Sequence, residues 1–383
     1  MKPNVLIPMA GLGNRFLKDG FHVPKQLINI KDKHLIDISM KCINLNNCNL
    51  IFIIRDEHIY NFRMDEILKN KFGNDIKIVV LDHLTDGSVS SCLFANEYIN
   101  NDDPLIIYTL DIEFFPYFDP HEICNIDGDG LLLTFKSNSI NYSYVDAIDN
   151  IALKTAEKKA ISNNACVGVY CFKKGKDFCK YAKIMIDKNI RTNNEFYIAP
   201  LFNLLINDNC KILTKEIEKI HVFGTPQEFY FYKNNVVKKI GEKPVAICSD
   251  HSGFICKENF KKILNKYNIK YIDYGTLVNR DCDYNKYIEQ AVNSIKDNSC
   301  DYGFGFCKTG QGVNICANKH KGIRSALIYD NYSMEMAIRH NCANFFSVPS
   351  KNYDENKLSE LIEIALNNSF DGGRHQLRIQ ELE

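Results

Sequence analysis

Residues 302–319 read YGFGFCKTGQGVNICANK and join three kinds of segment in one short stretch. The apolar, aromatic run YGFGFC has the composition of a buried strand. The turn KTGQG follows it, and its glycines leave free backbone N–H groups where a helix would begin. A strand that passes through a glycine-rich turn into a helix is the unit from which parallel α/β sheets are built.

The same alternation continues on both sides of this stretch. Helical spacing of apolar residues, such as Ile288, Ala291, Val292 and Ile295, fills the segments between strand-like runs. The runs lie at 244–250, 270–275, 302–307, 323–329 and 345–349. Five strands alternating with helices predict a doubly wound α/β domain with a five-stranded parallel sheet.

The first part of the chain carries a second series of strands. Apolar runs lie at 4–10, 50–56, 76–82, 104–111 and 130–136. The spacing leaves room for helices between them, which predicts an α/β domain with mostly parallel strands. The polar stretch YKNNVVKKIGEKP then ends in Gly and Pro, as linkers often do. We therefore expect domains at 1–235 and 244–383, joined by a linker at 236–243.

Composition limits the possible functions. A chain of 383 residues is long for one domain, and 47 basic residues balance 47 acidic ones without a long run of either sign. No nucleic-acid or membrane-surface partner is therefore expected. No apolar stretch approaches ~18 residues, and the N-terminus lacks a cleavage pattern, so we expect a cytoplasmic protein. The cysteines number 15, an odd count without a CxxC pair, which favours reduced core thiols over disulfides.

A glycine turn and two cations follow the first predicted strand. The turn MAGLGNRF at 9–16 offers the backbone of Gly11 and Gly13, and Arg15 and Lys25 stand beside it in sequence. Backbone N–H groups and cations of this kind can cradle a triphosphate. The glycines alone are equally typical of an ordinary strand-to-helix turn.

The wider pattern resembles the sugar-phosphate nucleotidyltransferases (nucleotide-sugar pyrophosphorylases) over residues 3–230. The resemblance rests on the glycine turn with PKQL at 24–27, and on TLDIEF at 109–114, AEKKAIS at 156–162, NNEFYIAPLFN at 193–203 and VFGTPQEF at 222–229. It implies a mixed, Rossmann-like sheet of the glycosyltransferase-A type. It also implies that Arg15 and Lys25 assist transfer, that Gly11, Gly13 and Gly87 contact a nucleoside triphosphate, that Asp111 binds Mg²⁺, and that Glu157 and Lys158 hold a sugar phosphate.

One position departs from that family. Members often carry a second metal-binding aspartate two residues before the Gly of GTP, and this chain has Val222 there. Either Asp111 and the substrate phosphates hold the metal, or the domain is weakened or inactive. A surface carboxylate at a strand end is the other interpretation of Asp111.

The second domain resembles type B ribose-5-phosphate isomerases and galactose-6-phosphate isomerase subunits over residues 244–383. The motifs, in order, are SDHSGF at 249–254, DYNKY at 283–287, CKTGQGVNICANK at 307–319, RHNCAN at 339–344 and GGRHQLR at 372–378. The resemblance implies that Cys307 is the base, that Thr309 and His340 assist ring opening, and that Asn341 with the amides near Gly310 and Gly312 holds an enediolate. It further implies that Asp250 and Tyr284 contact hydroxyls, and that His251, Arg374 and Arg378 bind the terminal phosphate.

Chemistry supports a base at Cys307. Moving a proton between C1 and C2 of a sugar needs a base beside those carbons and donors for the developing oxyanion. A thiol with a free pKa of ~8.5 becomes a better base where glycine-loop amides favour the thiolate. A core thiol, a metal ligand and a covalent nucleophile paired with His340 are the alternatives. Lys308 replaces the family's usual glycine and could lower the thiol pKa or read a different sugar.

Together the two resemblances predict a bifunctional enzyme of activated-sugar biosynthesis. Its substrates would be a nucleoside triphosphate and a sugar phosphate, with Mg²⁺ for the first domain and no cofactor for the second. Composite sites between two copies of residues 244–383 would make it at least a homodimer. The alternative is that only the isomerase is catalytic and the first domain is a regulatory module that binds nucleotide or sugar phosphate.

Overall fold

The computed structural model describes residues 1–30, 33–236 and 239–382. The chain divides into two compact units, Met1–Phe229 and Tyr230–Glu383. Helix α10 (Pro226–Phe231) crosses this boundary, which lies before the predicted domain end at 235. Residues 237–238 of the predicted linker, 236–243, fall outside the described residues. None of the helices described is long and apolar enough to cross a membrane.

The first unit is built on a nine-stranded mixed sheet of order β5-β4-β1-β6-β11-β8-β12-β10-β9. Four of the predicted runs form parallel neighbours, namely β1 (Asn4–Pro8), β4 (Asn49–Arg55), β5 (Lys77–Leu81) and β6 (Leu105–Tyr108). The remaining strands are β8 (Gly130–Lys136), β9 (Ser143–Ile148), β10 (Ile151–Glu157), β11 (Asn164–Phe172) and β12 (Ile212–Glu216).

The prediction of mostly parallel strands is wrong for this second half of the sheet. Strand β11 runs antiparallel to both β6 and β8, and β9 pairs antiparallel with β10. The β9–β10 connection is a tight turn in which Asp149 (φ 50°) and Asn150 (φ 62°) adopt positive φ. Such a turn reverses the chain at once and leaves no room for the crossover helix that a parallel pair needs.

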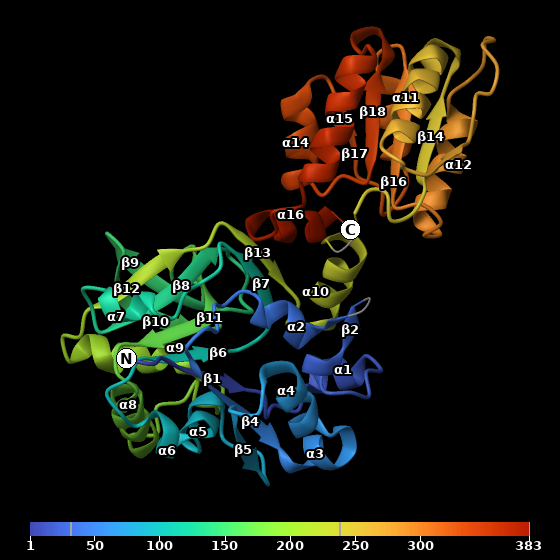
Figure 1. Cartoon of the computed structure of the whole chain (residues 1–383). Coiled ribbons are helices and arrows are strands. Elements are labelled where there is room, and N and C mark those ends of the chain that lie inside the picture. Colours follow the sequence, from blue (N-terminus) through green and yellow to red (C-terminus); the bar gives the residue numbers. More distant parts are fainter. Residues whose placement is uncertain (31–32, 237–238, 383) are drawn as a thin grey trace. The chain divides into compact units, whose positions relative to one another are not determined.

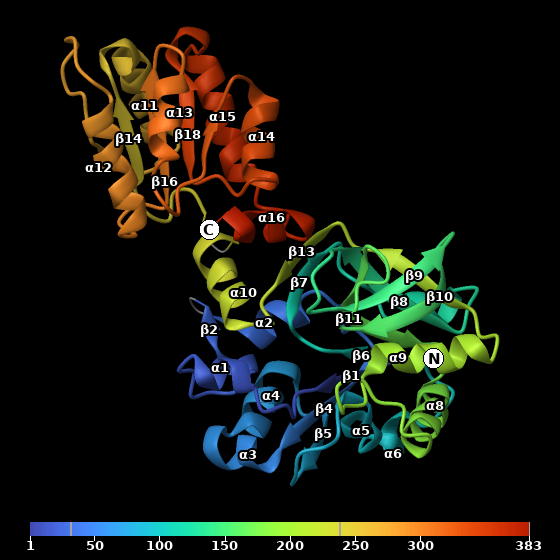
Figure 2. The same cartoon turned by 180° about the vertical axis from the view of Figure 1, so that it is seen from behind.

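Helices cover both faces of this sheet, as Figures 1 and 2 show. Alternate residues of β1 enter different cores, Leu6 on one face and Val5 and Ile7 on the other. The Leu6 face packs against α5 (Ser88–Leu93), α8 (Gly175–Asp187) and α9 (Ile198–Asn207). The opposite face packs against α2 (Leu35–Met40), α4 (Met64–Phe72) and α7 (Glu122–Asn125). Short elements complete the unit: α1 (Asn14–Lys18), α3 (Asp56–Phe62), α6 (Asn96–Ile99), and β7 (Ile112–Phe115) paired with β13 (Lys219–Val222).

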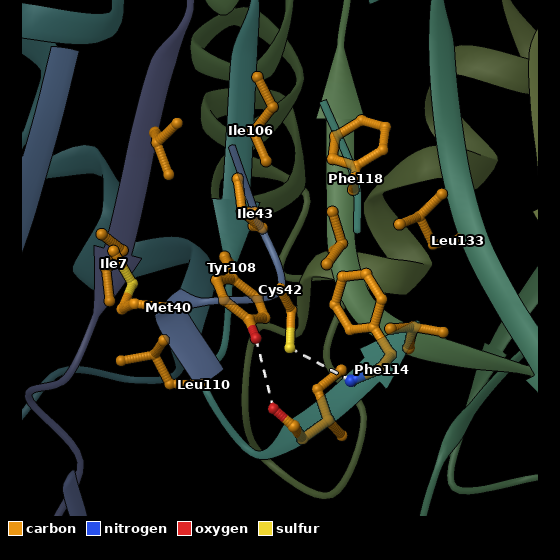
Figure 3. Close-up of a cluster of buried hydrophobic side chains, with 14 of the residues drawn as sticks. Ile7, Met40, Cys42, Ile43, Ile106, Tyr108, Leu110, Phe114, Phe118 and Leu133 are labelled. Atoms are coloured by element: carbon orange, nitrogen blue, oxygen red, sulfur yellow. Dashed lines mark hydrogen bonds between the residues drawn. The ribbon is translucent and has the colours of Figure 1, made fainter. Parts of the chain in front are cut away.

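One core region anchors the chain around Asp111. Figure 3 shows Tyr108, Cys42 and Phe114 packed together, with the Phe114 N–H donating to Cys42 Sγ at 3.2 Å. The Tyr108 hydroxyl donates to the Ser39 carbonyl at 2.9 Å. Burial raises the pKa of Cys42 to about 12, so this thiol stays protonated. All fifteen cysteines of the chain are free thiols in the structure.

The second unit is a five-stranded sheet of order β15-β14-β16-β18-β17, with every pair parallel. All five predicted strands are confirmed, as β14 (Val245–Ser249), β15 (Tyr271–Asp273), β16 (Tyr302–Cys307), β17 (Ser325–Leu327) and β18 (Phe345–Pro349). One face packs against α11 (Phe254–Lys266), α14 (Asn331–Arg339) and α15 (Glu355–Asn367), and the other against α12 (Asn285–Lys296) and α13 (Gln311–Ala317). This is the doubly wound domain that the sequence predicts. Its last helix is α16 (Arg374–Leu382).

Candidate active sites

A cavity of about 820 Å³ opens at the carboxyl ends of β1, β4, β5 and β6 in the first unit. Gly13 has φ 63° at the start of α1, a conformation that favours glycine, and an added Cβ would meet nothing within 4 Å. The backbone turn, rather than lack of space, therefore requires this glycine. Six predicted residues line the cavity, namely Gly11, Gly13, Arg15, Lys25, Gly87 and Asp111.

Asp111 reaches the cavity because the chain turns sharply before it. Leu110 adopts φ 54°, unusual for a residue with a branched side chain, and its carbonyl accepts a hydrogen bond from Ser39 Oγ at 3.2 Å. The Asp111 carboxylate pairs with the ammonium of Lys25 and remains 41 % exposed. The buried chain thus presents a carboxylate and a cation together at the cavity wall.

Gly87 allows the loop after β5 to pack closely against the segment 193–203. Its φ is 125°, and an added Cβ would lie 2.5 Å from the backbone nitrogen of Phe196. That nitrogen donates to the Asp86 carbonyl at 2.8 Å, and the Val89 N–H donates to the Phe196 carbonyl at 3.0 Å. Any side chain at position 87 would push these two segments apart.

Glu157 and Lys158 do not line this cavity. The Lys158 ammonium donates to the Tyr197 hydroxyl at 2.6 Å and lies 4.7 Å from the centre of that ring. Glu157 accepts from Ser143, and burial raises its pKa. The nearby charge of Glu195, which does line the cavity, also raises that pKa. The predicted sugar-phosphate element therefore lies beside the cavity wall rather than on it.

Val222 is buried in β13, where it pairs with Ile112. Gly224 lies near two carboxylates, since a Cβ added there would lie 3.4 Å from Asp111 Oδ2 and 3.6 Å from Glu228 Oε2. Glu228 accepts from the Thr225 N–H at 2.9 Å and from the Tyr142 hydroxyl at 2.8 Å, so it caps α10. The described residues contain no cluster of three metal-ligating side chains. Asp111 alone still suits Mg²⁺, which commonly takes one or two carboxylates with substrate phosphates and water.

In the second unit, Asp250 and His251 follow β14. The Asp250 carboxylate accepts from the Gly253 N–H at 2.8 Å, and an added Cβ at Gly253 would lie 2.2 Å from the Phe306 carbonyl oxygen. Glycine therefore lets this turn approach β16 closely. His251 Nδ1 lies 3.2 Å from the Cys282 backbone nitrogen and 3.3 Å from the Cys282 carbonyl oxygen, and Nε2 lies 3.7 Å from the Asp281 carboxylate.

Cys307 ends β16, next to this turn. The Gly310 N–H donates to Cys307 Sγ at 3.2 Å, a contact that stabilises negative charge on the sulfur. Gly310 has φ 73° at the start of α13, and an added Cβ at Gly312 would lie 2.7 Å from the Tyr284 ring. The TGxG pattern thus turns the chain and admits Tyr284 beside the thiol. Asp250, Tyr284, Cys307, Gly310 and Gly312 are brought together at one end of the sheet.

Lys308 and Thr309 are exposed. Thr309 Oγ1 accepts from the Gln311 N–H at 3.4 Å. Lys308 lines a separate depression of about 360 Å³ together with Lys351 and Ser252, and Cys307 is not part of its wall. The side chain of Lys308 is thus directed away from the thiol.

His340 and Asn341 lie at the opposite end of the same sheet. They precede β18, whose first residue, Phe345, is paired with Gly303, whereas Cys307 is paired with Pro349. The four residue steps from Gly303 to Cys307 alone span roughly 13 Å. His340 stacks on His375 of α16 with ring centres 4.1 Å apart. One copy of the chain therefore does not bring His340 to Cys307.

The predicted phosphate-binding arginines belong to α16, beside His340. Arg378 is exposed, and the side chain of Arg374 lies outside the part of the molecule that the structure describes. Asp371, just before α16, lies 3.8 Å from His340 Nε2 and accepts from Arg339 at 3.1 Å. The tail and the His-Asn pair form a second group of polar residues, distinct from the group around Cys307.

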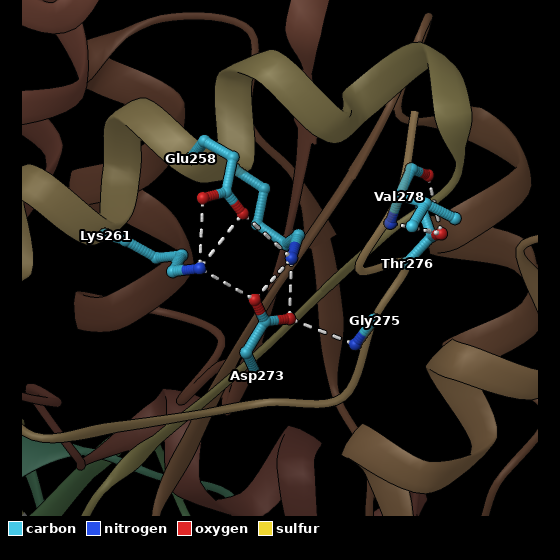
Figure 4. A network of polar contacts seen from close by, with 7 residues as sticks. Glu258, Lys261, Asp273, Gly275, Thr276 and Val278 are labelled. Carbon is cyan, nitrogen blue, oxygen red and sulfur yellow. Dashed lines mark hydrogen bonds and ion pairs between the residues drawn. The ribbon is translucent and has the colours of Figure 1, made fainter. Parts of the chain in front are cut away.

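A network of ion pairs lies at the end of β15, as Figure 4 shows. The Lys257 side chain is fully buried and donates to Asp273 at 2.6 Å, and Asp273 also accepts from the Gly275 N–H at 3.0 Å. Lys261 lies 3.2 Å from the same carboxylate and 3.0 Å from Glu258. Asp273 thus connects α11 to the loop that leads toward Tyr284.

Replacing Asp273 by alanine is expected to destabilise the second unit by about 3–5 kcal/mol, because a buried Lys257 loses its main counter-charge. Urea unfolding followed by circular dichroism measures this change. Glu355→Ala, which removes the exposed pair with Lys262, is the control and should cost at most about 1 kcal/mol. A double variant, Lys257→Met with Asp273→Leu, should recover most of the loss; persistence of the full loss would show that the charge is not its cause.

Sequence reasoning gave no role to several ionisable residues on the wall of the first cavity, among them Arg55, His58 and Glu195. Arg55 ends β4, directly beside the glycine turn that follows β1. The signal was present in the sequence, since RDEH at 55–58 spans the end of the predicted strand at 50–56 and places a cation and an imidazole at a strand's carboxyl end.

Comparison with known proteins identifies the family of the second unit. Residues 245–382 match the model of the Ribose/Galactose Isomerase family. Ribose-5-phosphate isomerase B of Escherichia coli is 31% identical over 140 residues, which cover 37% of this chain and 94% of that protein. A ribose-5-phosphate isomerase B of Listeria innocua is 32% identical over 139 residues, covering 36% and 94%. The chain belongs to the ribose/galactose isomerase family. This membership comes from the second unit, which carries Cys307.

The first unit has a structural neighbour of a different kind. A nucleoside-diphosphate-sugar pyrophosphorylase from Vibrio cholerae matches with a TM-score of 0.54 and 23% identity, over 60% of this chain and 99% of that one. The likeness shows that the N-terminal region has a pyrophosphorylase fold. The predicted fold class of both units is thereby confirmed.

Proposed function

We propose that this chain is a bifunctional enzyme of activated-sugar biosynthesis. Its first unit transfers a nucleotidyl group from a nucleoside triphosphate to a sugar phosphate and releases pyrophosphate. Its second unit interconverts the aldose and ketose forms of a pentose or hexose phosphate. The observation that supports the first activity is the meeting of Asp111, Lys25 and the glycine turn on one cavity wall. Family membership supports the second.

In the transfer reaction, a phosphate oxygen of the sugar phosphate attacks the α-phosphorus, and the bond to the β-phosphate breaks. No protein nucleophile is needed, so the protein contributes positioning and charge neutralisation. Arg15 and Lys25 offset the charge of the triphosphate, and the turn at Gly11 and Gly13 supplies backbone donors. Mg²⁺ held by Asp111 would polarise the phosphoryl oxygens.

In the isomerisation, Cys307 as thiolate takes a proton from the carbon next to the carbonyl and returns it to the other carbon. The enediolate that forms carries negative charge on oxygen, which the amides at Gly310 and Gly312 stabilise. Asp250 and Tyr284 bind hydroxyls, and His251 binds the terminal phosphate. Thr309 assists ring opening. All of these residues belong to the end of the sheet at which Cys307 lies.

The remaining groups would come from a second copy. His340, Asn341, Arg374 and Arg378 belong to segments at the other end of the sheet, so a two-fold dimer that brings unlike ends together would complete each site. The proposal is thus a homodimer through residues 244–383, with two composite isomerase sites.

Mixing two inactive variants tests this dimer. Cys307→Ala and His340→Ala, dissociated and reassociated together, should recover roughly a quarter of wild-type isomerase activity, because half of randomly paired dimers are mixed and each has one intact site of two. Coupled assays of sugar-phosphate isomerisation measure the recovery. No recovery, with mixed dimers shown by differently tagged copies, would contradict the shared site.

The first unit has an alternative function to nucleotidyl transfer. Val222 in place of a second metal-binding aspartate favours a module that binds nucleotide or sugar phosphate without turnover. Pyrophosphate release with four triphosphates and a panel of pentose and hexose phosphates separates the two. Release that requires both substrates supports transfer, whereas binding without release supports the module. We expect both units to work in the cytoplasm, where fifteen free thiols would stay reduced.

A further inference from the structure

The cavity of the first unit extends along four strand ends. In the sheet order β5-β4-β1-β6, Asp111 follows β6 at one end, and His83 and Leu84 follow β5 at the other. Strands lie ~4.8 Å apart, so these ends are separated by roughly 14 Å. Under the proposed function, the phosphates occupy the end with Asp111 and Lys25. The nucleoside then faces the ends of β4 and β5.

Arg55 lies at that nucleoside end. It is buried, with 8% of its surface exposed, and it lines the cavity. Its guanidinium pairs with the half-exposed carboxylate of Glu57, and its Nη2 lies 3.3 Å from His58 Nε2. No hydrogen-bond partner for Nε is found among the described residues. Nε has almost no accessible surface, so a ligand acceptor in the cavity would reach it only after a small shift of the guanidinium; such a shift would be favourable, because a buried donor without an acceptor is costly.

The His58 ring cannot accept hydrogen bonds from both of the Arg55 groups that face it. Burial and the charge of Arg55 lower its pKa to about 4, so the ring is neutral at pH 7. A neutral imidazole has one acceptor nitrogen, yet donors face both. The Arg55 backbone N–H lies 3.4 Å from Nδ1, and the guanidinium lies 3.3 Å from Nε2. Arg55 and His58 together therefore hold one more donor than the imidazole can accept.

We infer that Arg55, supported by His58, reads the nucleobase and selects bases that carry a carbonyl oxygen. This inference rests on the proposed nucleotide binding. Guanine, cytosine and uracil each present carbonyl acceptors, and arginine forms paired hydrogen bonds with O6 and N7 of guanine. Adenine has no carbonyl oxygen, and its exocyclic amino group would confront the guanidinium donor-to-donor. The side chains of Leu81 and Leu84 supply apolar wall for the base.

Binding of GTP, CTP, UTP, ATP and inorganic tripolyphosphate to the full chain, measured by isothermal titration calorimetry, tests the inference. For the wild type we expect at least one carbonyl-bearing triphosphate to bind about ten- to a hundred-fold more tightly than ATP, the discrimination typical of an arginine pair. Arg55→Gln should reduce that ratio to within about three-fold and leave tripolyphosphate binding unchanged. Arg55→Lys, which keeps the charge but not the planar fork, should also lose the preference.

Arg63→Gln is the matched control, because Arg63, between α3 and α4, is exposed and pairs only with Glu66 among the described residues. It should keep the wild-type ratio. Equal affinity for all four triphosphates, or tighter binding of ATP, would overturn the inference while nucleotide binding stands. A parallel loss for tripolyphosphate in Arg55→Gln would assign Arg55 to phosphate and overturn it too. If no triphosphate binds the wild type, the proposed nucleotide site fails and the inference with it.

Discussion

Asp111→Ala is expected to reduce nucleotidyl transfer by at least about a thousand-fold, because charge stabilisation by a metal contributes several kcal/mol and each 1.4 kcal/mol is a factor of ten. The carboxylate is the only one of the described residues that faces Lys25 on the cavity wall. The fold should survive, since the chain at this position is held by backbone contacts, such as the Phe223 N–H to the Asp111 carbonyl at 3.0 Å. Pyrophosphate release at saturating Mg²⁺ measures the loss.

Two further variants show whether the charge of Asp111 causes the loss of nucleotidyl transfer. Asp111→Asn keeps the size of the side chain and should be nearly as inactive, because the charge is what binds the metal. Asp75→Ala, an exposed carboxylate before β5, should behave as the wild type. Turnover close to wild type in Asp111→Ala would remove this residue from the mechanism.

The second unit was predictable from its sequence almost throughout. Its strands are short apolar runs separated by helices, so each is recognised from local composition, and doubly wound topology then follows. The separation of the two polar groups was also within reach. Cys307 is the last residue of β16, whereas His340 comes shortly before β18. In a sheet whose strands are all parallel, the end of one strand and the start of another must lie at opposite edges. Only the sheet order had to come from the structure.

The first unit was less predictable because its later strands pair with distant partners. Strand β11 joins β6, some sixty residues earlier in the chain (Val169 with Tyr108), and nothing local to either segment specifies that pairing. The cavity depends on other non-local pairings, those of β1 with β4 and with β6, which place these three strands side by side. The convergence of Lys25, Gly87 and Asp111 therefore follows from the assembled sheet, whereas the glycine turn and its conformation could be predicted from the sequence alone. The position of Arg55 on the same wall has the same origin.

Cys307→Ala is expected to lower isomerisation by about a hundred- to ten-thousand-fold, the range that a positioned general base contributes. The thiol is 5% exposed and accepts the Gly310 N–H, so it is held in place and its loss removes the proton acceptor itself. Pyrophosphate release should be nearly unchanged, because the residues proposed for transfer all belong to the first unit.

The size of this effect separates a base from a core thiol. Cys316→Ala removes a thiol of α13 that is half-buried and has no proposed role, and it should retain isomerase activity. Cys307→Ser keeps a polar group of similar size but a much weaker acid, so it should be impaired nearly as much as the alanine variant. Exchange of the substrate C2 hydrogen with solvent deuterium, followed by NMR, reports proton removal directly and should be lost in both Cys307 variants. If exchange persists in Cys307→Ala while the Cys316→Ala protein behaves normally, another group is the base. Cys307 is then only a packed thiol at the end of β16.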